Sequence, residues 1–498
     1  MTKQDKKELR QQIACEWLEE NYLNYGSLRH DVVTDRLQIR VADLESLSAP
    51  NNATSIIGGP AEDGSAYSLE FRGKESWRNL TDKDINTMVC QCVMESGVNI
   101  SVTEMWTALK SDMVPAVHPL REWLDGLRPW NSCEPDWIDW VASQVHVMDA
   151  SATDRCEAPV DRHSVAVDGR SATPVEFHSQ STASRASDLQ CSASERNYSK
   201  ANYSSHSERS EADRLWRVCF KKWFVAMVAS WMKDEVVNHT VLVLVGRQGI
   251  FKTTWLDNLI PPELRAYSSK LPLSGQISKD DRLRLCENGL LNIDELDAIC
   301  GREMNIVKSL LTSTDVNERA AYGRLKERRV RLASFCASTN KREFLTDVTG
   351  NRRWLPFEVE SIQNPFYTTL PYEQMYAQAW ALAQDPMFSY WFDLAEIEVL
   401  EQHNQHFRDE SNEEQLLPIL FDVPAEGKGE FMTTAQISER LVTYGNIKKP
   451  MALSRLGMVL GAHGFTKKMI GAKRLRGWLV YQRDTDEINA KRSLYAKY

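Results

Sequence analysis

The run from Val241 to Trp255 constrains this chain most, because an apolar strand leads directly into a glycine-containing loop and a helix. Its first part, Val241 to Val245, is apolar without alternation, which predicts a strand buried on both faces of a parallel sheet. Gly246 and Gly249 then allow the backbone to curl so that amide groups point at an anion. The run therefore predicts a phosphate-binding loop, although a chance strand, turn and helix with a lysine has the same local pattern.

Residues of the loop are expected to contact different parts of a nucleoside triphosphate and its metal. Lys252 is expected to reach the β- and γ-phosphates, and the Thr253 hydroxyl to bind Mg²⁺. The residues expected to contact the nucleotide are consecutive: Gly246, Arg247, Gln248, Gly249, Ile250, Phe251, Lys252, Thr253 and Thr254. The full phosphate-loop signature has glycine immediately before the lysine, where this chain has Phe251. Phe251 must therefore take a negative φ or carry backbone strain.

A second apolar strand follows from Gly289 and ends in two adjacent carboxylates, Asp294 and Glu295. At the carboxyl end of a strand, Asp294 would hold Mg²⁺, and Glu295 would act as a general base on the attacking water. Two acids after a strand are otherwise a solvated strand end. The pair gains weight from its place after the phosphate-loop motif.

A third apolar strand, 331–338, leads to Asn340, whose amide would orient the attacking water; asparagine is otherwise a common turn residue. Further on, Arg352 and Arg353 offer two guanidinium groups. Either can act across a subunit boundary as an arginine finger, or the two can be a basic pair on the surface. Strand, loop, acids, amide and arginines in this order predict nucleoside-triphosphate binding, while order alone does not establish hydrolysis.

Residues 216–362 resemble the virulence-associated protein E family, superfamily-3-like helicase ATPases of phages and mobile elements. The segments that carry the resemblance are Gly246–Trp255, Asn292–Asp297, Asn317–Arg324, Ala333–Asn340 and Leu345–Arg353. The resemblance implies an AAA+-like core, ATP and Mg²⁺ as cofactors, and movement along DNA by a homo-oligomeric ring, expected to be a hexamer. Many relatives have an amino-terminal primase-like domain, of which this sequence shows no sign. Priming is not predicted, and a separate primase stays open as a partner.

A basic stretch, 319–331, lies between the carboxylate strand and the asparagine strand. In a ring helicase of this type, a hairpin at this place enters the channel and contacts single-stranded DNA. The expected DNA contacts are Tyr322, Arg324, Lys326 and Arg328. The alternative is a solvated hairpin that pairs with acids of a neighbouring subunit.

The amino-terminal part, residues 1–150, is expected to be a mainly helical accessory region, with Thr81 capping a helix over Asp84. Six tryptophans at helical spacing are expected to pack in cores: Trp77, Trp106, Trp123, Trp130, Trp137 and Trp140. Residues 151–210 contain 14 serines and one leucine, which predicts a disordered insertion. The apolar run 223–232 that follows is too short to cross a bilayer and predicts a buried core helix.

Charge is asymmetric near the carboxyl terminus. Residues 393–430 hold 11 acids and 2 bases and are expected to be an acidic linker, whereas 431–483 hold 10 bases and one acid. Two helices and two strand-like runs in 431–483 predict a winged helix that binds duplex DNA. The expected contacts are Ser454, Arg455, Lys467, Lys468, Lys473, Arg474 and Arg476. The alternative is a small helical cap whose bases balance the acidic linker. Residues 484–498 are expected to be a tail.

The sequence thus predicts an α/β P-loop ATPase domain at 211–392 with accessory units on both sides. The net charge is −9, so DNA affinity must come from local basic patches. Ten cysteines form no C-x-x-C pair, and neither a signal peptide nor a membrane span is apparent, so a cytoplasmic protein is expected. The expected function is an ATP-dependent DNA helicase in replication of a phage or mobile element. The alternatives are a nucleotide-gated DNA-binding regulator or origin-binding initiator, and a degenerate ATPase that only binds DNA.

Overall fold

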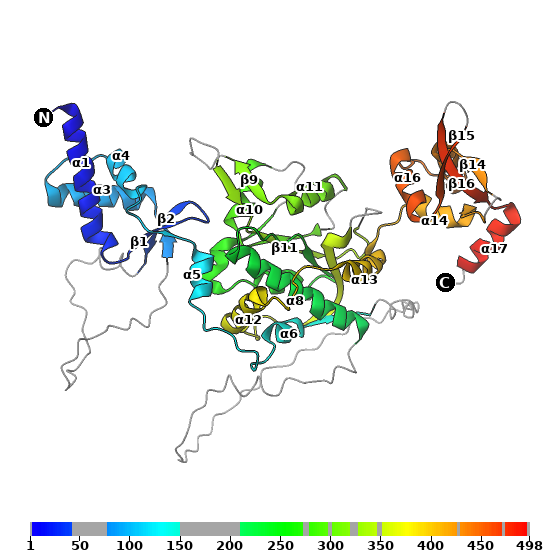
Figure 1. Ribbon diagram of the computed structural model, residues 1–498, viewed down its shortest axis with the longest axis horizontal. Helices are drawn as coiled ribbons and strands as arrows, with labels where there is room; N and C mark the ends of the chain where they lie inside the picture. The colour runs from blue at the N-terminus through cyan, green and yellow to red at the C-terminus, as the bar shows by residue number, and fades with distance from the viewer. Residues whose placement is uncertain are drawn as a thin grey trace, which may run out of the picture.

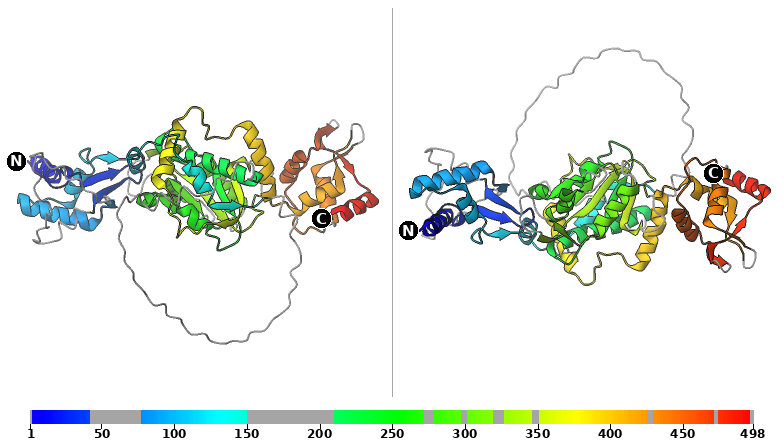
Figure 2. Two further views of the ribbon diagram at one scale, coloured as in Figure 1. Left: turned by 90° about the horizontal axis from the view of Figure 1, so that it is seen from below. Right: turned by 90° about the horizontal axis from the view of Figure 1, so that it is seen from above.

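The computed structural model describes residues 2–41, 77–149, 210–271, 278–296, 301–318, 327–345, 351–425, 429–470 and 474–495. Three folded units follow one another along the long axis, an amino-terminal unit, a central unit and a carboxyl-terminal unit (Figures 1 and 2). The chain is a mixed α/β protein in which helices pack on sheets. The expected contacts Tyr322, Arg324, Lys326 and Lys473 and most of the serine-rich insertion 151–210 lie outside the described residues.

The central unit is built on a six-stranded sheet. Five strands are parallel, and the edge strand β5 is antiparallel to β12. The strand order is β5 (Val145–Val147), β12 (Trp354–Ile362), β6 (Val241–Val245), β11 (Ser334–Thr339), β8 (Leu290–Ile293) and β7 (Ser268–Lys270). Every residue of β6, β8 and β11 is buried. Burial on both faces is the reason why β6 is apolar without alternation.

Helices cover both faces of the sheet (Figure 1). Leu242 and Leu244 of β6 pack in one core cluster, while Val241, Val243 and Val245 pack in another, because successive side chains of a strand point to opposite faces. The first cluster is completed by helices α8 (Glu211–Met232), α9 (Lys252–Asp257) and α12 (Tyr372–Gln384). The second is completed by α10 (Lys279–Glu287) and α11 (Gly301–Thr312). Loops at the strand ends are therefore held between two packed layers.

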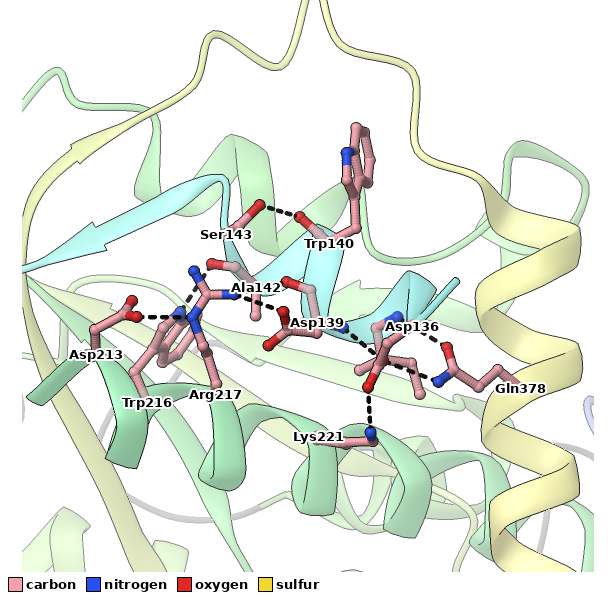
Figure 3. A network of polar contacts seen from close by, with 11 residues as sticks. Asp136, Asp139, Trp140, Ala142, Ser143, Asp213, Trp216, Arg217, Lys221 and Gln378 are labelled. Carbon is pink, nitrogen blue, oxygen red and sulfur yellow. Dashed lines mark hydrogen bonds and ion pairs between the residues drawn. The ribbon is translucent and has the colours of Figure 1, made fainter. Parts of the chain in front are cut away.

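Helix α8 is a core helix, as its apolar run predicted. All residues from Trp223 to Trp231 are buried. Two of its charged residues contact helix α6 (Trp137–Ala142) and its cap: Arg217 forms ion pairs with Asp139 of α6 and with Asp213 of α8, and Lys221 pairs with the cap residue Asp136 (Figure 3). Burial would raise the pKa of Asp136, but its hydrogen bonds, led by that from Lys221, bring the pKa below its ordinary value. No helix in the described parts of the chain has the length and apolarity needed to cross a membrane.

The segment before residue 150 divides between two units, which differs from the expected boundary. Helices α5 (Pro119–Asp125) and α6 pack on α8, and strand β5 joins the central sheet. Gln378 of α12 accepts a hydrogen bond from the Ile138 amide and donates one to Asp136. This pairing joins positions more than two hundred residues apart, so local sequence periodicity carries no signal for it.

The amino-terminal unit, for which a mainly helical region was expected, has more residues in helices than in strands, and its helices pack against a four-stranded sheet. Strands β3 (Trp77–Asn79), β2 (Arg36–Arg40), β1 (Leu28–Asp31) and β4 (Ala116–Val117) lie in that order. The helices are α1 (Lys3–Leu18), α3 (Asp82–Ser96) and α4 (Val102–Leu109). Thr81 caps α3 in a capping box with Asp84, as predicted. The strands have two to five residues, too short for a clear period-two pattern.

Asp31 connects the amino-terminal unit to the central one. It is fully buried, and its carboxylate accepts hydrogen bonds from the Val33 and Thr34 amides, from Gln38 and from the Tyr267 hydroxyl of the central unit.

Four of the six tryptophans pack against apolar cores, as expected: Trp106 in the amino-terminal unit, and Trp123, Trp137 and Trp140 in the central one.

His118, the amino-terminal cap of α5, predicts a pH-dependent stability. Its Nδ1 accepts from the Arg121 amide at 3.3 Å, and burial, with the Arg121 charge, lowers its pKa from 6.5 to about 4. Between these two pKa values, His118 is protonated in the unfolded chain but not in the folded protein. The free energy of unfolding therefore falls as the pH falls from 6.5 to 4. Since His118 is only partly buried, we expect a loss of about 2 kcal/mol.

Urea unfolding at pH 7.5 and pH 4.5 measures this effect. The matched variant is His118→Asn, which keeps a side-chain acceptor at the cap but does not titrate. We expect the stability of the variant to fall less with acidity than that of the wild type. Equal falls in both proteins would show that other groups cause the acid sensitivity.

The carboxyl-terminal unit begins within the expected acidic linker, so that expectation is corrected. Helix α13 (Leu394–Asn404) packs on β12 of the central unit, and α14 (Asn412–Leu420) packs on α15 (Thr434–Gly445). Two of the acids are buried with partners: Glu413 accepts from the Met451 amide, and Glu414 pairs with Arg408. A count of charges does not reveal this, because it does not distinguish a buried paired acid from a solvated one.

The predicted order of helix, helix and two strands is present in the carboxyl-terminal unit. Helices α15 and α16 (Leu453–Ala462) precede the hairpin of β15 (Thr466–Ile470) and β16 (Leu475–Gln482). Strand β13 (Phe421–Asp422) pairs with the carboxyl-terminal end of β16. Strand β14 (Glu430–Met432) pairs with residues 478–480 of β16, two of which also pair with β15. The expected tail 484–498 contains a helix, α17 (Thr485–Tyr495).

Candidate functional site

The ends of three parallel strands meet at one edge of the central sheet. β6 leads into the loop 246–251 and helix α9, β8 ends before Asp294, and β11 ends before Asn340. Together they surround a cavity of about 340 Å³. Its lining residues are Gln248, Gly249, Phe251, Lys252, Thr253, Thr254, Asp294, Glu295, Ser338, Thr339 and Asn340. The residues predicted to contact the nucleotide or its metal mostly line this one cavity: Gln248, Gly249, Phe251, Lys252, Thr253, Thr254 and Asp294. Gly246, Arg247 and Ile250 are not among its lining residues.

Glycine is required at two positions of the loop for different reasons. At Gly246 (φ 155°) a Cβ atom would lie 2.7 Å from the Val359 carbonyl oxygen of β12, so a side chain would separate loop and sheet. Gly249 has open space around it but a φ of 86°, which other residues rarely adopt. These positions let the loop curl tightly against the end of the sheet.

Phe251 takes the strained alternative. Its φ is 68° and its ψ 17°, in the left-handed region, immediately before the first residue of α9. A non-glycine residue in this region costs about 1–2 kcal/mol. The loop therefore keeps the backbone shape that a glycine would give and stores strain at Phe251.

The strain predicts an ordering of two variants that both remove the ring. Phe251→Gly and Phe251→Ala lose the same side-chain contacts, but only glycine takes the left-handed conformation without cost. We expect the glycine variant to be more stable than the alanine variant by about 1 kcal/mol. Chemical denaturation of both proteins under one condition measures the difference. Equal stabilities would mean that the loop relaxes to a negative φ when the ring is removed.

Lys252 is held inside the loop. Only 6% of its surface is exposed, and its Nζ donates to the carbonyl oxygens of Gly246 and Arg247 at 2.7 Å and to Asn340 Oδ1 at 3.0 Å. The ammonium group thus links the loop after β6 to the residue after β11. It supplies a fixed positive charge on one side of the cavity.

Asp294 supplies a negative charge close to Thr253. Its Oδ1 accepts from the hydroxyls of Thr253 and Ser338, each at 3.0 Å, and its Oδ2 accepts from Lys270 Nζ at 2.6 Å. Burial would raise the pKa of Asp294, but these hydrogen bonds, led by that from Lys270, lower it below the ordinary value. Asp294 is therefore a carboxylate at neutral pH. A carboxylate beside two hydroxyls offers the oxygen donors that Mg²⁺ prefers.

Glu295 and Asn340 also lie at this edge. Glu295 is exposed, and its backbone has a φ of 56°, a second left-handed non-glycine residue in the cavity lining. Strained backbone of this kind concentrates at functional sites, where the surrounding structure maintains it. The position is open to water, as a general base requires.

Lys270 and Ser338 were not predicted. Lys270 is the last residue of the edge strand β7 and forms an ion pair with Asp294. The hydrogen bond to Asp294 raises the pKa of Lys270 above its ordinary value, although burial acts in the opposite direction. No motif marks the edge strand, so Lys270 carries no sequence signal. Ser338 has one: it lies two residues before Asn340, and alternate residues of a strand share a face.

Arg352 and Arg353 are not brought to the cavity within one chain. They form a short 3₁₀ turn, Asn351–Arg353, at the start of β12, whereas the cavity lies at the carboxyl ends of the strands. Both line a second cavity of about 440 Å³, together with Thr240 at the start of β6. Burial, with the nearby Arg353 charge, lowers the pKa of Lys308 to about 8.

In the basic stretch 319–331, the described residues 328–331 are less exposed than their charges suggest. Strands β9 (Asp315–Glu318) and β10 (Glu327–Val330) form an antiparallel hairpin. Arg328 is mostly exposed and pairs with Asp315 at 2.8 Å, but Arg329 donates to the Val33 carbonyl of the amino-terminal unit. Arg331 is fully buried. Arg328 is thus the expected DNA contact that the structure describes in this hairpin.

The carboxyl-terminal unit brings several of the expected DNA contacts to one groove of about 470 Å³. Ser454 of α16 and Lys467, Lys468 and Arg476 of the hairpin line it. Arg474 is exposed in the hairpin turn with a φ of 47°, and Arg455 is partly buried. The groove lies between the second helix and the hairpin, and its lining contains bases and no acid.

One family model matches a part of the chain that includes most of the central unit. Residues 199–409 match the family model of the virulence-associated protein E-like domain. The match covers the cavity, the hairpin and helix α13, and it confirms the resemblance seen in the sequence for that part of the chain. No curated protein matches the chain.

Two solved structures of the NrS-1 C-terminal region are similar to the chain. The A form of its apo structure shares 10% identity, covers 93% of this chain and 99% of that chain, and gives a TM-score of 0.39. A second apo structure of the same region shares 10% identity, covers 91% and 96%, and gives the same TM-score.

Proposed function

Because residues 199–409 form a virulence-associated protein E-like domain, we propose that this chain is an ATP-dependent DNA helicase of superfamily-3 type in replication of a phage or mobile element. The observation that carries the proposal is one cavity that is lined by both Lys252 and Asp294, with Asp294 hydrogen-bonded to Thr253. This arrangement fits the triphosphate and metal of a P-loop ATPase. The strand order β12-β6-β11-β8-β7 supports an AAA+-like core.

The residues divide the work of binding and hydrolysis. Lys252 and the amides of the loop 246–251 hold the phosphates, and Thr253 and Asp294 hold Mg²⁺, which neutralises phosphate charge when bound. Glu295 accepts a proton from the attacking water, and Asn340 orients that water. Lys252 and Asn340 are already joined by a hydrogen bond, so a change at the phosphates reaches both strand ends.

Arg352 and Arg353 fit a role in trans. They lie away from the cavity of their own chain, as required of arginines that act on a neighbouring subunit in a ring. A homo-hexameric ring with single-stranded DNA in its channel is part of the proposal, with the β9–β10 hairpin as the channel contact and Arg328 on it. Duplex DNA is assigned to the carboxyl-terminal groove, as in a winged helix.

The rival is a nucleotide-gated DNA-binding regulator or initiator that does not unwind DNA. The strained Phe251 and the basic carboxyl-terminal groove favour it, because a slow ATPase with a duplex-binding unit acts as a switch. A degenerate ATPase that binds DNA without turnover is the third possibility.

ATP turnover with and without single-stranded DNA, measured beside strand displacement on a forked duplex, separates these functions. We expect DNA-stimulated turnover and unwinding by the wild type, and loss of both in Glu295→Gln with ATP binding retained. Glu360→Gln, an exposed acid of β12, is the matched control and should behave as wild type. Turnover without strand displacement would support the regulator, and no turnover would support the degenerate ATPase.

A further inference from the structure

The ring of Phe251 has a defined aromatic neighbour. It meets Phe366 edge-on, with ring centroids 6.1 Å apart and planes at 82°. Phe366 follows β12, which ends at Ile362. Because β12 runs parallel to β6, its carboxyl end lies at the same edge of the sheet as the loop 246–251. Two segments far apart in sequence thus place aromatic rings together at the rim of the cavity.

The second segment exposes its aromatic side chains to water. Phe366 is 74% exposed and the adjacent Tyr367 89% exposed. The turn that presents them is hydrogen-bonded: Asn364 accepts from the Phe366 amide through its side chain at 3.0 Å and from the Tyr367 amide through its carbonyl at 3.1 Å. Two large aromatic side chains that stay exposed to water contribute little to the stability of the fold. Their position beside a concave polar cavity indicates a ligand contact.

The cavity itself suits phosphate and metal but not a nucleobase. Apart from Phe251, its lining residues are polar, charged or glycine. A base needs a flat apolar surface, which must lie beyond the phosphate cavity but continuous with it. Phe251 is the residue that belongs to both places, since it lines the cavity and contacts Phe366.

We propose that Phe366 is the nucleobase platform of this site, with Tyr367 beside it and the Phe251 ring supporting its edge. The inference rests on the proposed function, in which the cavity holds a triphosphate. It gives a physical reason for Phe251: the ring that glycine lacks supports the platform, and the loop tolerates a left-handed phenylalanine for that support. Stacking uses a face that every base has, so the site discriminates weakly among nucleobases.

The test compares ATP with inorganic tripolyphosphate, which has the phosphate chain but no base. Calorimetric titration of the full chain in Mg²⁺ gives both affinities for the wild type, Phe366→Ala and Phe366→Leu. We expect both substitutions to weaken ATP about tenfold and to change tripolyphosphate affinity less than about twofold, because leucine keeps apolar bulk but lacks the aromatic face. Tyr25→Ala removes a similarly exposed aromatic residue of the amino-terminal unit and should change neither affinity.

The outcomes are distinguishable. Unchanged ATP affinity in Phe366→Ala would overturn the inference, as would an equal loss for ATP and tripolyphosphate, which would mean that Phe366 positions the phosphate loop. Leucine at 366 that binds ATP as the wild type does would also overturn it, since bulk alone would then suffice. A wild type that binds neither ligand would overturn the proposed function itself. Thermal unfolding of each variant checks that it is folded.

Discussion

Replacing Lys252 with alanine is expected to reduce ATP turnover at least about a hundredfold, the range for loss of one preorganised charge contact to a reacting group. The ammonium group lies inside the loop with 6% exposure, hydrogen-bonded to two loop carbonyls and to Asn340. Alanine removes the positive charge on the phosphate side of the cavity and the link between the loop and β11. Steady-state phosphate release at saturating ATP and Mg²⁺ measures the effect.

The control for this substitution is Lys83→Ala, which removes an exposed lysine of α3 in the amino-terminal unit. Its turnover should equal that of the wild type. Turnover by Lys252→Ala within a few-fold of the wild type would contradict the assignment of Lys252 to the phosphates. An unfolded Lys252→Ala protein is recognised by circular dichroism, and Lys252→Arg then serves as the second variant, since it keeps the charge but not the compact ammonium geometry.

The second large effect is expected at Arg331, on stability. Arg331 is fully buried, and it donates to the carbonyl oxygens of Leu310, Leu311 and Ser313 near the end of α11, and to those of Ala333 and Asn238. A helix leaves its last carbonyls without internal partners, and a cation there also complements the helix dipole. Burial lowers the pKa of Arg331 to about 9, which leaves it charged at neutral pH.

Arg331→Met removes the donors and the charge at similar bulk, and leaves several buried carbonyls without partners. We expect the free energy of unfolding to fall by at least about 3 kcal/mol, since each unsatisfied buried group costs about 1–3 kcal/mol. Urea unfolding followed by fluorescence measures it. Arg128→Met, at an arginine that is 88% exposed, should change stability by less than about 0.5 kcal/mol. A loss of similar size at both positions would refute the capping role of Arg331.

The parts of the fold that local pattern determines were predictable. Each of these elements is recognised from the hydrophobic pattern of its own residues. They are the apolar strand 241–245, the helix α8, and the two helices and the hairpin near the carboxyl terminus. The cavity followed from them, because residues after the carboxyl ends of parallel strands meet at one edge. This is why the sequence predicts Lys252, Asp294 and Asn340 as residues of one site.

The rest depends on long-range contacts that local pattern does not encode. Strand β5 pairs with β12 although it precedes the serine-rich insertion in the sequence and β12 follows it. Lys270 donates a hydrogen bond to Asp294 from an edge strand that no sequence motif marks. Arg331 was counted with a basic surface stretch but turns into the core, because its partners are carbonyls at the end of α11. For Phe251 the sequence allowed either a negative φ or a strained backbone. The structure has the strained backbone, in a loop that packs closely against the sheet.

The central claim is that Lys252 and Asp294 hold one triphosphate with its metal between them. Titration of ATP into the wild type and Asp294→Asn, each with and without Mg²⁺, tests it most directly. The account predicts that Mg²⁺ tightens ATP binding by about tenfold or more in the wild type and has little effect in Asp294→Asn, a coupling of ordinary size between two ligands. The same Mg²⁺ dependence in both proteins would contradict it.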